Sequence, residues 1–230
     1  MLHCPIVKRL VVAVDGPSGA GKGTVARAAA RALGYRHIDT GAMYRAVAWR
    51  SLQLGVTLDD TVAVTAVAHR AALELSDGVV GIDGHDITAA IRTPEVDKAA
   101  TLVARNPAVR DVLVARQRAL GAGGGVVMEG RDIGTVVFPL AEVKIYLDAS
   151  PEERARRRAA DPAHTSGTAS VADVAEDLAA RDMSDSTRSV APLMKADDAV
   201  YIDTTGVAID DVVTQVLALV RDKVAAGASD

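Results

Sequence analysis

VVAVDGPSGAGKGTVARAA, residues 11–29, is the stretch of this 230-residue chain that decides its fold. A β-branched run from Leu10 to Val14 leads into a glycine-rich turn, and apolar residues then recur at helical spacing from Lys22 to Leu33. We therefore predict a strand, a turn and a helix in direct succession. Such a turn presents a row of backbone N–H groups at the positive end of the helix, which favours binding of a polyphosphate.

The turn has the composition of a phosphate-binding loop, with one departure from the usual pattern. The residues predicted to hold the phosphates are Gly16, Pro17, Ser18, Gly19, Ala20, Gly21, Lys22, Gly23 and Thr24. The usual loop, G-x-x-x-x-G-K-[ST], carries a magnesium-binding hydroxyl directly after the lysine, whereas here Gly23 follows Lys22 and the hydroxyl comes at Thr24. Lys22 is expected to reach the β- and γ-phosphates. A bound Mg²⁺ would rely on phosphate oxygens and waters, with Thr24 or a distant acid contributing indirectly.

Two other interpretations of the turn are open. A glycine-rich turn between a strand and a helix can lack a ligand, but four glycines together with a lysine disfavour that interpretation. A dinucleotide site needs G-x-G-x-x-G and an acid about 20 residues further on, and Asp39 lies near that spacing. Lys22 favours a terminal phosphate instead.

Strands and helices alternate along the rest of the chain. Further strands are predicted over 37–38, 126–129, 143–147 and 199–202. Further helices are predicted over 40–53, 58–75, 94–104 and 107–120, from Pro151, and over 171–183 and 209–224, with a polar loop over 160–170. Between 73 and 91, alternating apolar and polar residues around Asp77-Gly78 and Asp83-Gly84 predict a small antiparallel insert. The alternation predicts an open α/β fold with a five-stranded sheet.

The composition argues against several classes of function. A net charge of −4 disfavours nucleic-acid and membrane-surface binding, because both depend on summed positive charge. The apolar run from Leu10 to Val14 is too short to span a membrane. Cys4 is the only cysteine, which leaves no disulfide framework and fits a reducing compartment. We expect a cytoplasmic monomer that acts on small molecules.

A phosphate loop serves a switch, a motor or a phosphotransferase, and the rest of the chain bears on the choice. A guanine-specific switch is expected to carry N-K-x-D for the base, and the sequence holds no such stretch. Transfer to a second substrate requires a second anion site. Four arginine-bearing stretches are available to build it: 39–45, Arg110, 130–132 and 181–188. The sequence therefore favours a phosphotransferase.

Five motifs in one order extend this interpretation over almost the whole chain, from Leu10 to about Val224. They are GPSGAGKGT (16–24), DTGAMYR (39–45), AAxxVAxxPxVR (99–110), EGRDIGTVVFP (129–139) and RDMSDSTRxVAPL (181–193). In this order the chain resembles the bacterial cytidylate kinases, nucleoside monophosphate kinases that transfer phosphate from ATP to CMP and dCMP. The resemblance implies a P-loop NTPase-type three-layer fold with a five-stranded parallel sheet, a small antiparallel β insert and a short lid. It divides the chain into a core (1–39, 121–150 and 189–230), a monophosphate-binding region (40–120, with the insert at about 73–91) and a lid region (151–188).

The resemblance also implies which residues form the site. The expected CMP-binding residues are Thr40, Arg45, Thr101, Arg110, Arg131, Asp132, Arg181, Asp185 and Arg188. The expected catalytic residues are Lys22, Arg131, Arg181 and Asp132, and Arg157 joins the phosphate loop in binding ATP. Family members commonly carry serine where this chain has Thr40 and Thr101, and each exchange keeps the hydroxyl. Glu129 stands where many relatives have aspartate, which leaves its part in the metal shell open.

Elementary chemistry is consistent with these roles. Arg45 and Arg110 suit bidentate binding of the acceptor phosphate, a planar match that lysine cannot make. Arg188 or Thr101 would meet the O2 and N3 acceptors of cytosine, and Asp185 the ribose hydroxyls. Arg131, Arg181 and the lid arginines would neutralise charge on the transferred group.

Less specific interpretations are open for some of these residues. Arg154, Arg157 and Arg158 share one helix face, which can simply be solvated, and Arg45 can pair with Asp39. For the whole chain, the alternatives are a UMP/CMP or other small-metabolite kinase and a nucleotide-binding switch that has lost transfer.

Overall fold

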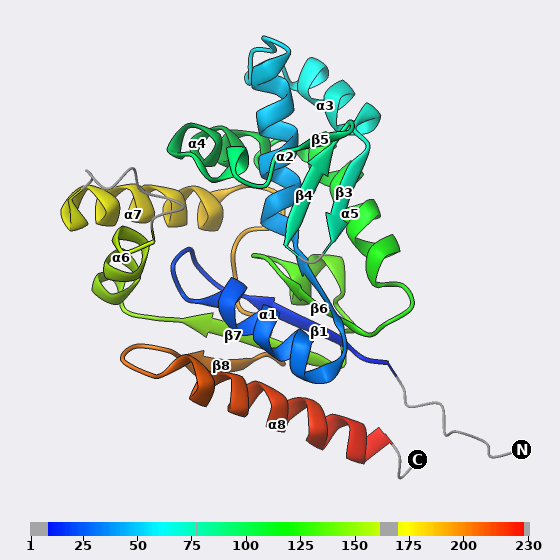
Figure 1. The fold of residues 1–230 in the computed structure, drawn as a ribbon, viewed down its shortest axis with the longest axis vertical. Helices are drawn as coiled ribbons and strands as arrows, with labels where there is room; N and C mark the ends of the chain where they lie inside the picture. Colours follow the sequence, from blue (N-terminus) through cyan, green and yellow to red (C-terminus); the bar gives the residue numbers. More distant parts are fainter. Residues whose placement is uncertain (1–8, 77, 162–169, 228–230) are drawn as a thin grey trace, which may run out of the picture.

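A central sheet of five parallel strands organises the chain (Figure 1). The computed structural model describes residues 9–76, 78–161 and 170–227; Cys4, Asp77 and most of the loop expected over 160–170 lie outside them. The strands are β1 (Val11–Asp15), β2 (Arg36–Asp39), β6 (Val126–Glu129), β7 (Val143–Asp148) and β8 (Val200–Asp203), in the spatial order β2-β6-β1-β7-β8. Every pairing between neighbours is parallel. The predicted five-stranded parallel sheet is confirmed.

Helices cover both faces of this sheet. On one face lie α1 (Lys22–Leu33) and α8 (Ile209–Gly227), and on the other α5 (Pro107–Gly121) and the π-helical segment η2 (Ile133–Val137). Side chains alternate along β1 accordingly: Val12 and Val14 pack against α1 and α8, whereas Ala13 belongs to the cluster that includes Val114 of α5. A strand buried on both faces is apolar throughout, and for this reason the apolar run beginning at Leu10 could be predicted as a strand.

A further hydrophobic core lies beyond the carboxyl end of the sheet. It comprises α2 (Thr40–Gln53), α3 (Thr61–Arg70), α4 (Pro94–Val103), the short η1 (Ala90–Arg92) and an antiparallel sheet of β3 (Leu73–Ser76), β4 (Val79–Ile82) and β5 (His85–Asp86). Asp83 and Gly84 both have positive φ, 50° and 77°, as a tight two-residue hairpin turn requires. The predicted antiparallel insert is confirmed.

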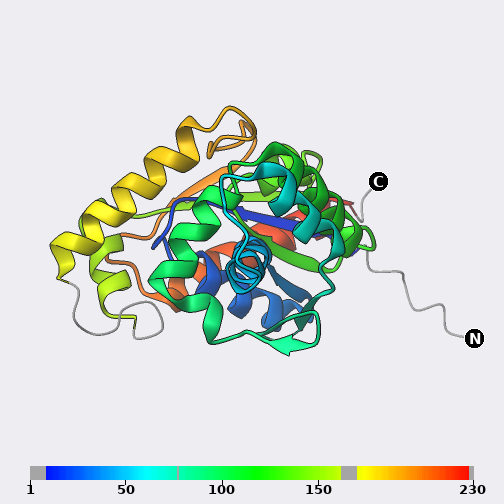
Figure 2. The same ribbon diagram turned by 90° about the horizontal axis from the view of Figure 1, so that it is seen from above.

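Two helices form a separate arm at one end of the molecule (Figure 2). They are α6 (Pro151–Ala159) and α7 (Val171–Thr187), packed on each other through Ala155, Val174 and Leu178. Ser150 caps α6 by accepting a hydrogen bond from the Glu153 N–H at 3.2 Å. No helix in the described part of the chain is both long and apolar enough to cross a membrane.

Two helix predictions need correction. The helix predicted over 58–75 is α3 and spans Thr61–Arg70. It begins late because Asp60 is its N-cap, accepting from the Ala63 N–H at 2.9 Å, and it ends early because Leu73–Ser76 pairs with β4. The helix predicted to end at Met183 continues to Thr187, where the hydroxyl groups of Ser186 and Thr187 donate to backbone carbonyls of the preceding turn.

Candidate active site

The glycine-rich turn between β1 and α1 lies at the carboxyl end of the sheet, and its geometry excludes larger residues. A Cβ on Gly16, whose φ is 144°, would lie 1.9 Å from the Leu147 carbonyl oxygen, and one on Gly19 would lie 2.9 Å from the Arg154 Cβ. Gly21 precedes α1 in the left-handed region and supplies no side-chain cap. This is the arrangement of an anion-binding helix start.

Lys22 is the first residue of α1 and is almost fully buried. Its Nζ donates to the Pro17 carbonyl oxygen across the loop. Burial, reinforced by the nearby charge of Arg131, lowers the pKa of Lys22 to about 7. An anion beside Nζ would favour the charged form, so the loop is suited to a phosphate more than to a neutral ligand.

Asp15, at the end of β1, positions the segment that follows β6. Its carboxylate accepts hydrogen bonds from the Ile133 and Gly134 N–H groups at 2.9 and 2.8 Å. Burial raises the pKa of Asp15 to about 6 despite these two bonds. The start of η2, and with it the Arg131-Asp132 pair just before it, is thereby held against the strand that carries the phosphate loop.

Glu129, the last residue of β6, lies close beside Gly23. A Cβ at Gly23 would lie 3.2 Å from Glu129 Oε1, and the same oxygen lies 2.8 Å from His37 Nε2. A carboxylate therefore stands close to where the usual loop has its magnesium-binding hydroxyl. Among the described residues no three acidic, histidine or cysteine side chains form a metal cluster. The donors present suit Mg²⁺, which prefers oxygen ligands and keeps several waters.

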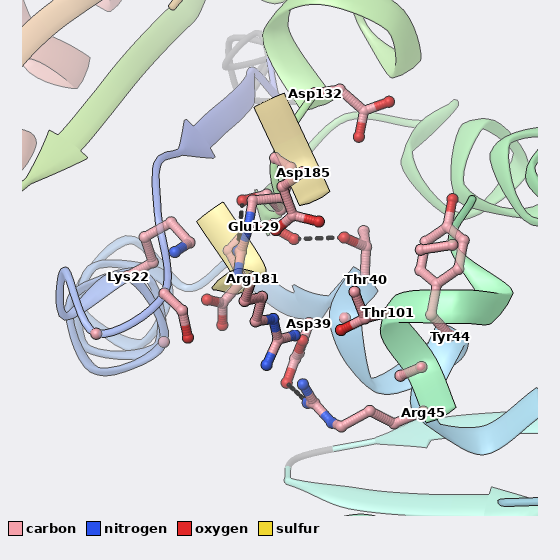
Figure 3. A pocket seen from close by; sticks show the side chains of 18 of the residues that line it. Lys22, Asp39, Thr40, Tyr44, Arg45, Thr101, Glu129, Asp132, Arg181 and Asp185 are labelled. Carbon is pink, nitrogen blue, oxygen red and sulfur yellow. Dashed lines mark hydrogen bonds and ion pairs between the residues drawn. The ribbon is translucent and has the colours of Figure 1, made fainter. Parts of the chain in front are cut away.

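A cavity of about 280 Å³ opens between the phosphate loop, α2, α4 and α7 (Figure 3). All nine residues expected to bind the acceptor line it: Thr40, Arg45, Thr101, Arg110, Arg131, Asp132, Arg181, Asp185 and Arg188. Gly19, Gly21, Lys22, Gly23 and Thr24 of the phosphate loop line it as well. In Figure 3, Arg181 lies between Lys22 and Arg45. Four stretches that are distant in sequence thus meet at one cavity.

Buried ion pairs organise the arginines of this cavity. Arg110 pairs closely with Asp132, Arg188 Nη2 lies 3.5 Å from Asp132 Oδ1, and Arg131 Nε donates to Asp185 at 2.9 Å. Burial raises the pKa of Asp185, but Arg131 and the other arginines outweigh it and hold that pKa below its usual value. Arg110 Nε and Arg188 Nη2 are buried and find no hydrogen-bond acceptor in the described part of the chain. Acceptor oxygens of a ligand or of water would satisfy these buried donors.

The three arginines on one face of α6 diverge to different partners. Arg154 donates to the Ser18 carbonyl oxygen at 3.2 Å and pairs closely with Asp182 of α7. Arg157 donates to Thr204, at 2.9 Å to the hydroxyl and 2.6 Å to the carbonyl oxygen. Arg158 pairs closely with Asp97 of α4. The face is therefore not a solvated one.

A second cavity, of about 520 Å³, adjoins the first and shares Gly19, Gly21 and Thr24 of the phosphate loop with it. Its walls include Gly19, Gly21, Thr24, Arg157, Thr204, Val207, Ala208, Ile209 and Val212. Arg157 lines this second cavity, whereas Arg45 and Arg110 line the first. The contact of Arg157 with ATP stays a prediction.

A sequence model of the family described as "Cytidylate kinase" matches residues 12–222. The chain belongs to the cytidylate kinase family. A cytidylate kinase from Solibacter usitatus is 49% identical over 222 residues, covering 96% of each chain, and one from Desulfitobacterium hafniense is 46% identical over 223 residues, also covering 96% of each. Among solved structures, a shikimate kinase from Acinetobacter baumannii in complex with shikimate is similar with a TM-score of 0.49 at 16% identity, over 94% of this chain and 95% of that one.

Sequence reasoning missed one residue that lies within a cytidylate kinase motif. Tyr44, the neighbour of Arg45 in DTGAMYR, lines the acceptor cavity and lies under Arg110, with the guanidinium carbon 5.6 Å from the ring centroid. Burial raises the pKa of Tyr44 to about 12, so its ring stays neutral. Its position inside the DTGAMYR motif is the sequence feature that could have identified it.

Arg45 pairs with Asp39, as the less specific interpretation predicts, and it also faces the cavity. It lines the acceptor cavity, and its Nη2 donates to Asp39 Oδ2 at 2.8 Å. Asp39 in turn caps α2 by accepting from the Ala42 N–H at 3.0 Å. The ion pair holds Arg45 at the cavity wall, and its contact with the acceptor phosphate stays a prediction.

Proposed function

We propose that this chain transfers the γ-phosphoryl group of ATP to CMP, and to dCMP. The observation that carries the proposal is the convergence of four arginine-bearing stretches on one cavity next to the phosphate loop. Family membership and the full-length similarity to curated cytidylate kinases support the same acceptor. We also retain the proposed division into a core, a monophosphate-binding region over 40–120 and a lid over 151–188, acting as a cytoplasmic monomer.

In the proposed complex, ATP lies along the phosphate loop. The base and ribose of ATP occupy the 520 Å³ cavity beside Arg157, and the triphosphate runs over Gly19 and Gly21 to Lys22. The apolar wall formed by Val207, Ile209 and Val212 suits a planar base, and the helix start suits the phosphates.

The acceptor lies in the 280 Å³ cavity. Arg45 and Arg110 bind its phosphate, Arg188 or Thr101 reads the cytosine, and Asp185 accepts from the ribose. An oxygen of the acceptor phosphate, already ionised, forms the new P–O bond while the bond between the γ-phosphorus and its bridging oxygen breaks, leaving the electron pair on ADP. Lys22, Arg131 and Arg181 stabilise the charge of the transferred group. Asp132 positions Arg110 and Arg188 through its two carboxylate oxygens.

Mg²⁺ is the proposed metal, bound together with ATP. Phosphate oxygens and waters supply most of its ligands, while Thr24 and Glu129 contribute at the edge of that shell, since both lie beside the loop. When bound, the ion neutralises charge on the β- and γ-phosphates. His37 holds Glu129 in place through its 2.8 Å contact.

An acceptor panel tests the proposal. The protein is incubated with ATP, Mg²⁺ and each of CMP, dCMP, UMP, AMP and GMP, and diphosphate products are separated by chromatography. CDP and dCDP are expected as the main products. Phosphorylation of UMP as readily as CMP would favour the UMP/CMP kinase alternative. ATP binding without any acceptor-dependent release of ADP would favour the switch and refute the transferase.

The lowered pKa of Lys22 makes ATP binding pH-linked. Because the pKa is about 7 in the protein alone, much of Lys22 is neutral at pH 8, and adjacent phosphates raise the pKa again. Because a raised pKa means proton uptake, Lys22 should take up about 1 proton when ATP binds at pH 8. Titration calorimetry in two buffers of different ionisation enthalpy measures this number. Lys22→Met should abolish that uptake, and equal uptake by the variant would assign the proton to another group.

A further inference from the structure

Asp97, on α4 of the monophosphate-binding region, contacts two arginines of the lid helices. Its Oδ2 accepts a close hydrogen bond from Arg158 of α6, and its Oδ1 lies 3.5 Å from Arg181 Nη1 of α7. The carboxylate thus meets one arginine on each oxygen. All three side chains are mostly buried, 11% exposed for Asp97 and 19% for each arginine. Both arginines line the acceptor cavity.

The two guanidinium groups repel each other where they meet. Burial lowers the pKa of Arg158 to about 10, the charge of Arg181 lowers it further, and Asp97 is the main opposing charge. Burial likewise lowers the pKa of Arg181, with Arg131 adding repulsion and Asp97 opposing it. Without the carboxylate, two partly buried like charges would separate toward solvent. Asp97 therefore keeps both cations together at the cavity wall.

The helix that carries Asp97 also carries Thr101, one of the expected CMP-binding residues. Thr101 lies one turn further along α4, lines the cavity, and donates its hydroxyl hydrogen to the Asp97 carbonyl oxygen at 3.1 Å. A second ion pair between α4 and α7, Lys98 with Asp177 at 3.7 Å, is 73% and 68% exposed and is screened by water. Of these contacts, the buried ones at Asp97 link the acceptor region to the lid arginines.

We infer that Asp97 is a positioning residue for phosphoryl transfer, fixing Arg158 and Arg181 toward the transferred group and tying both lid helices to α4. The inference rests on the proposed function for what the two arginines do. Asp97 itself needs no contact with either substrate. It acts before the reaction, by holding the cations in the geometry that the transition state uses.

The kinetic test compares substitutions at Asp97 that keep or remove its charge. Asp97→Asn, nearly the same shape without the charge, should lower kcat for CDP formation about tenfold with KM for ATP and CMP within about twofold. Asp97→Glu, which keeps the charge, should recover most of that loss. The matched control is Asp177→Asn, which removes the exposed ion pair between the same helices and should leave kcat unchanged. An unaltered kcat in Asp97→Asn, or equal losses in the Asn and Glu variants, would overturn the inference.

A second readout needs no substrate. Amide hydrogen exchange of the full chain without nucleotide should be faster across α6 and α7 in Asp97→Asn than in the wild type, and unchanged in Asp177→Asn. If the acceptor panel finds no CMP phosphorylation while this exchange difference is present, the proposed function fails and the link between α4 and the lid stands. If CMP is phosphorylated but exchange is the same in all variants, the link is refuted.

Discussion

Replacing Lys22 with methionine is expected to lower kcat for CDP formation on the order of 10³-fold or more. The ammonium group stands at the start of α1 next to Gly23, and it lines the acceptor cavity with Arg131 and Arg181. Of these three, it is the one placed on the phosphate loop, where charge shifts between the β- and γ-phosphates during transfer. Methionine fills similar space but supplies no charge there.

The loss should not come from unfolding. Lys22 is buried, and burial disfavours its charged form enough to lower its pKa to about 7. Removing a buried amine relieves that cost, so the melting temperature of Lys22→Met should equal or exceed that of the wild type. Lys98→Met, at a lysine whose side chain is 73% exposed, is the control and should retain full activity. A kcat for Lys22→Met within tenfold of the wild type would place the lysine away from the transferred phosphate.

Local signals allowed much of the fold to be predicted. The bounds of α1 and α2 were predicted because their ends are set by nearby residues: Gly34 ends α1 in the left-handed region, and Asp39 caps α2. The end of α3 was not predicted, because Leu73 and Leu75 continue an apolar pattern compatible with a helix. These two residues pair with Ile82 and Val80 of β4, and that pairing makes the segment a strand. A search for helical periodicity does not detect a pairing with a separate segment.

Sequence motifs predicted which residues gather at the cavity, but they did not predict which residues pair across the chain. The nine acceptor residues come from four motifs, and all of them line one cavity. Asp97 and Arg158 are 61 residues apart, and His37 and Glu129 are 92 apart. An ion pair leaves no periodicity in sequence, so neither contact had a local signal.

Gly23 is another position where a residue distant in the sequence matters. From sequence, the missing hydroxyl after Lys22 was interpreted as a trait of the nucleoside monophosphate kinases, with no residue named beside it. In the structure, the Glu129 carboxylate stands 3.2 Å from where a side chain at Gly23 would begin, and His37 holds it there. A side chain at position 23 would press on this carboxylate, so Glu129 would have to shift by a few tenths of an ångström to admit one.

Replacing Arg188 with methionine should lower kcat/KM for CMP on the order of 10²-fold while leaving ATP affinity near the wild-type value. Arg188 is buried, lies 3.5 Å from Asp132 and 3.9 Å from Asp185, and has a buried Nη2 with no hydrogen-bond acceptor among the described residues. A free N–H group of this kind can donate a hydrogen bond to CMP. Arg157, which lines the second cavity, is the residue proposed to contact ATP, so the affinities for the two substrates should respond separately.

Arg188 also has a structural contact, which the test must separate from its role in binding. Its Nε donates to the Ala191 carbonyl oxygen, and Ala191 has a φ of 51°, so the turn after α7 depends on this bond. Arg188→Lys keeps the charge without the planar fork and should fall between the wild type and the methionine variant if recognition is at stake. ATP affinity is measured by calorimetry without CMP, and the melting temperature reports on the turn. A parallel loss of ATP affinity in a variant that melts like the wild type would assign Arg188 to the donor side, because only a residue shared with the triphosphate would weaken both substrates.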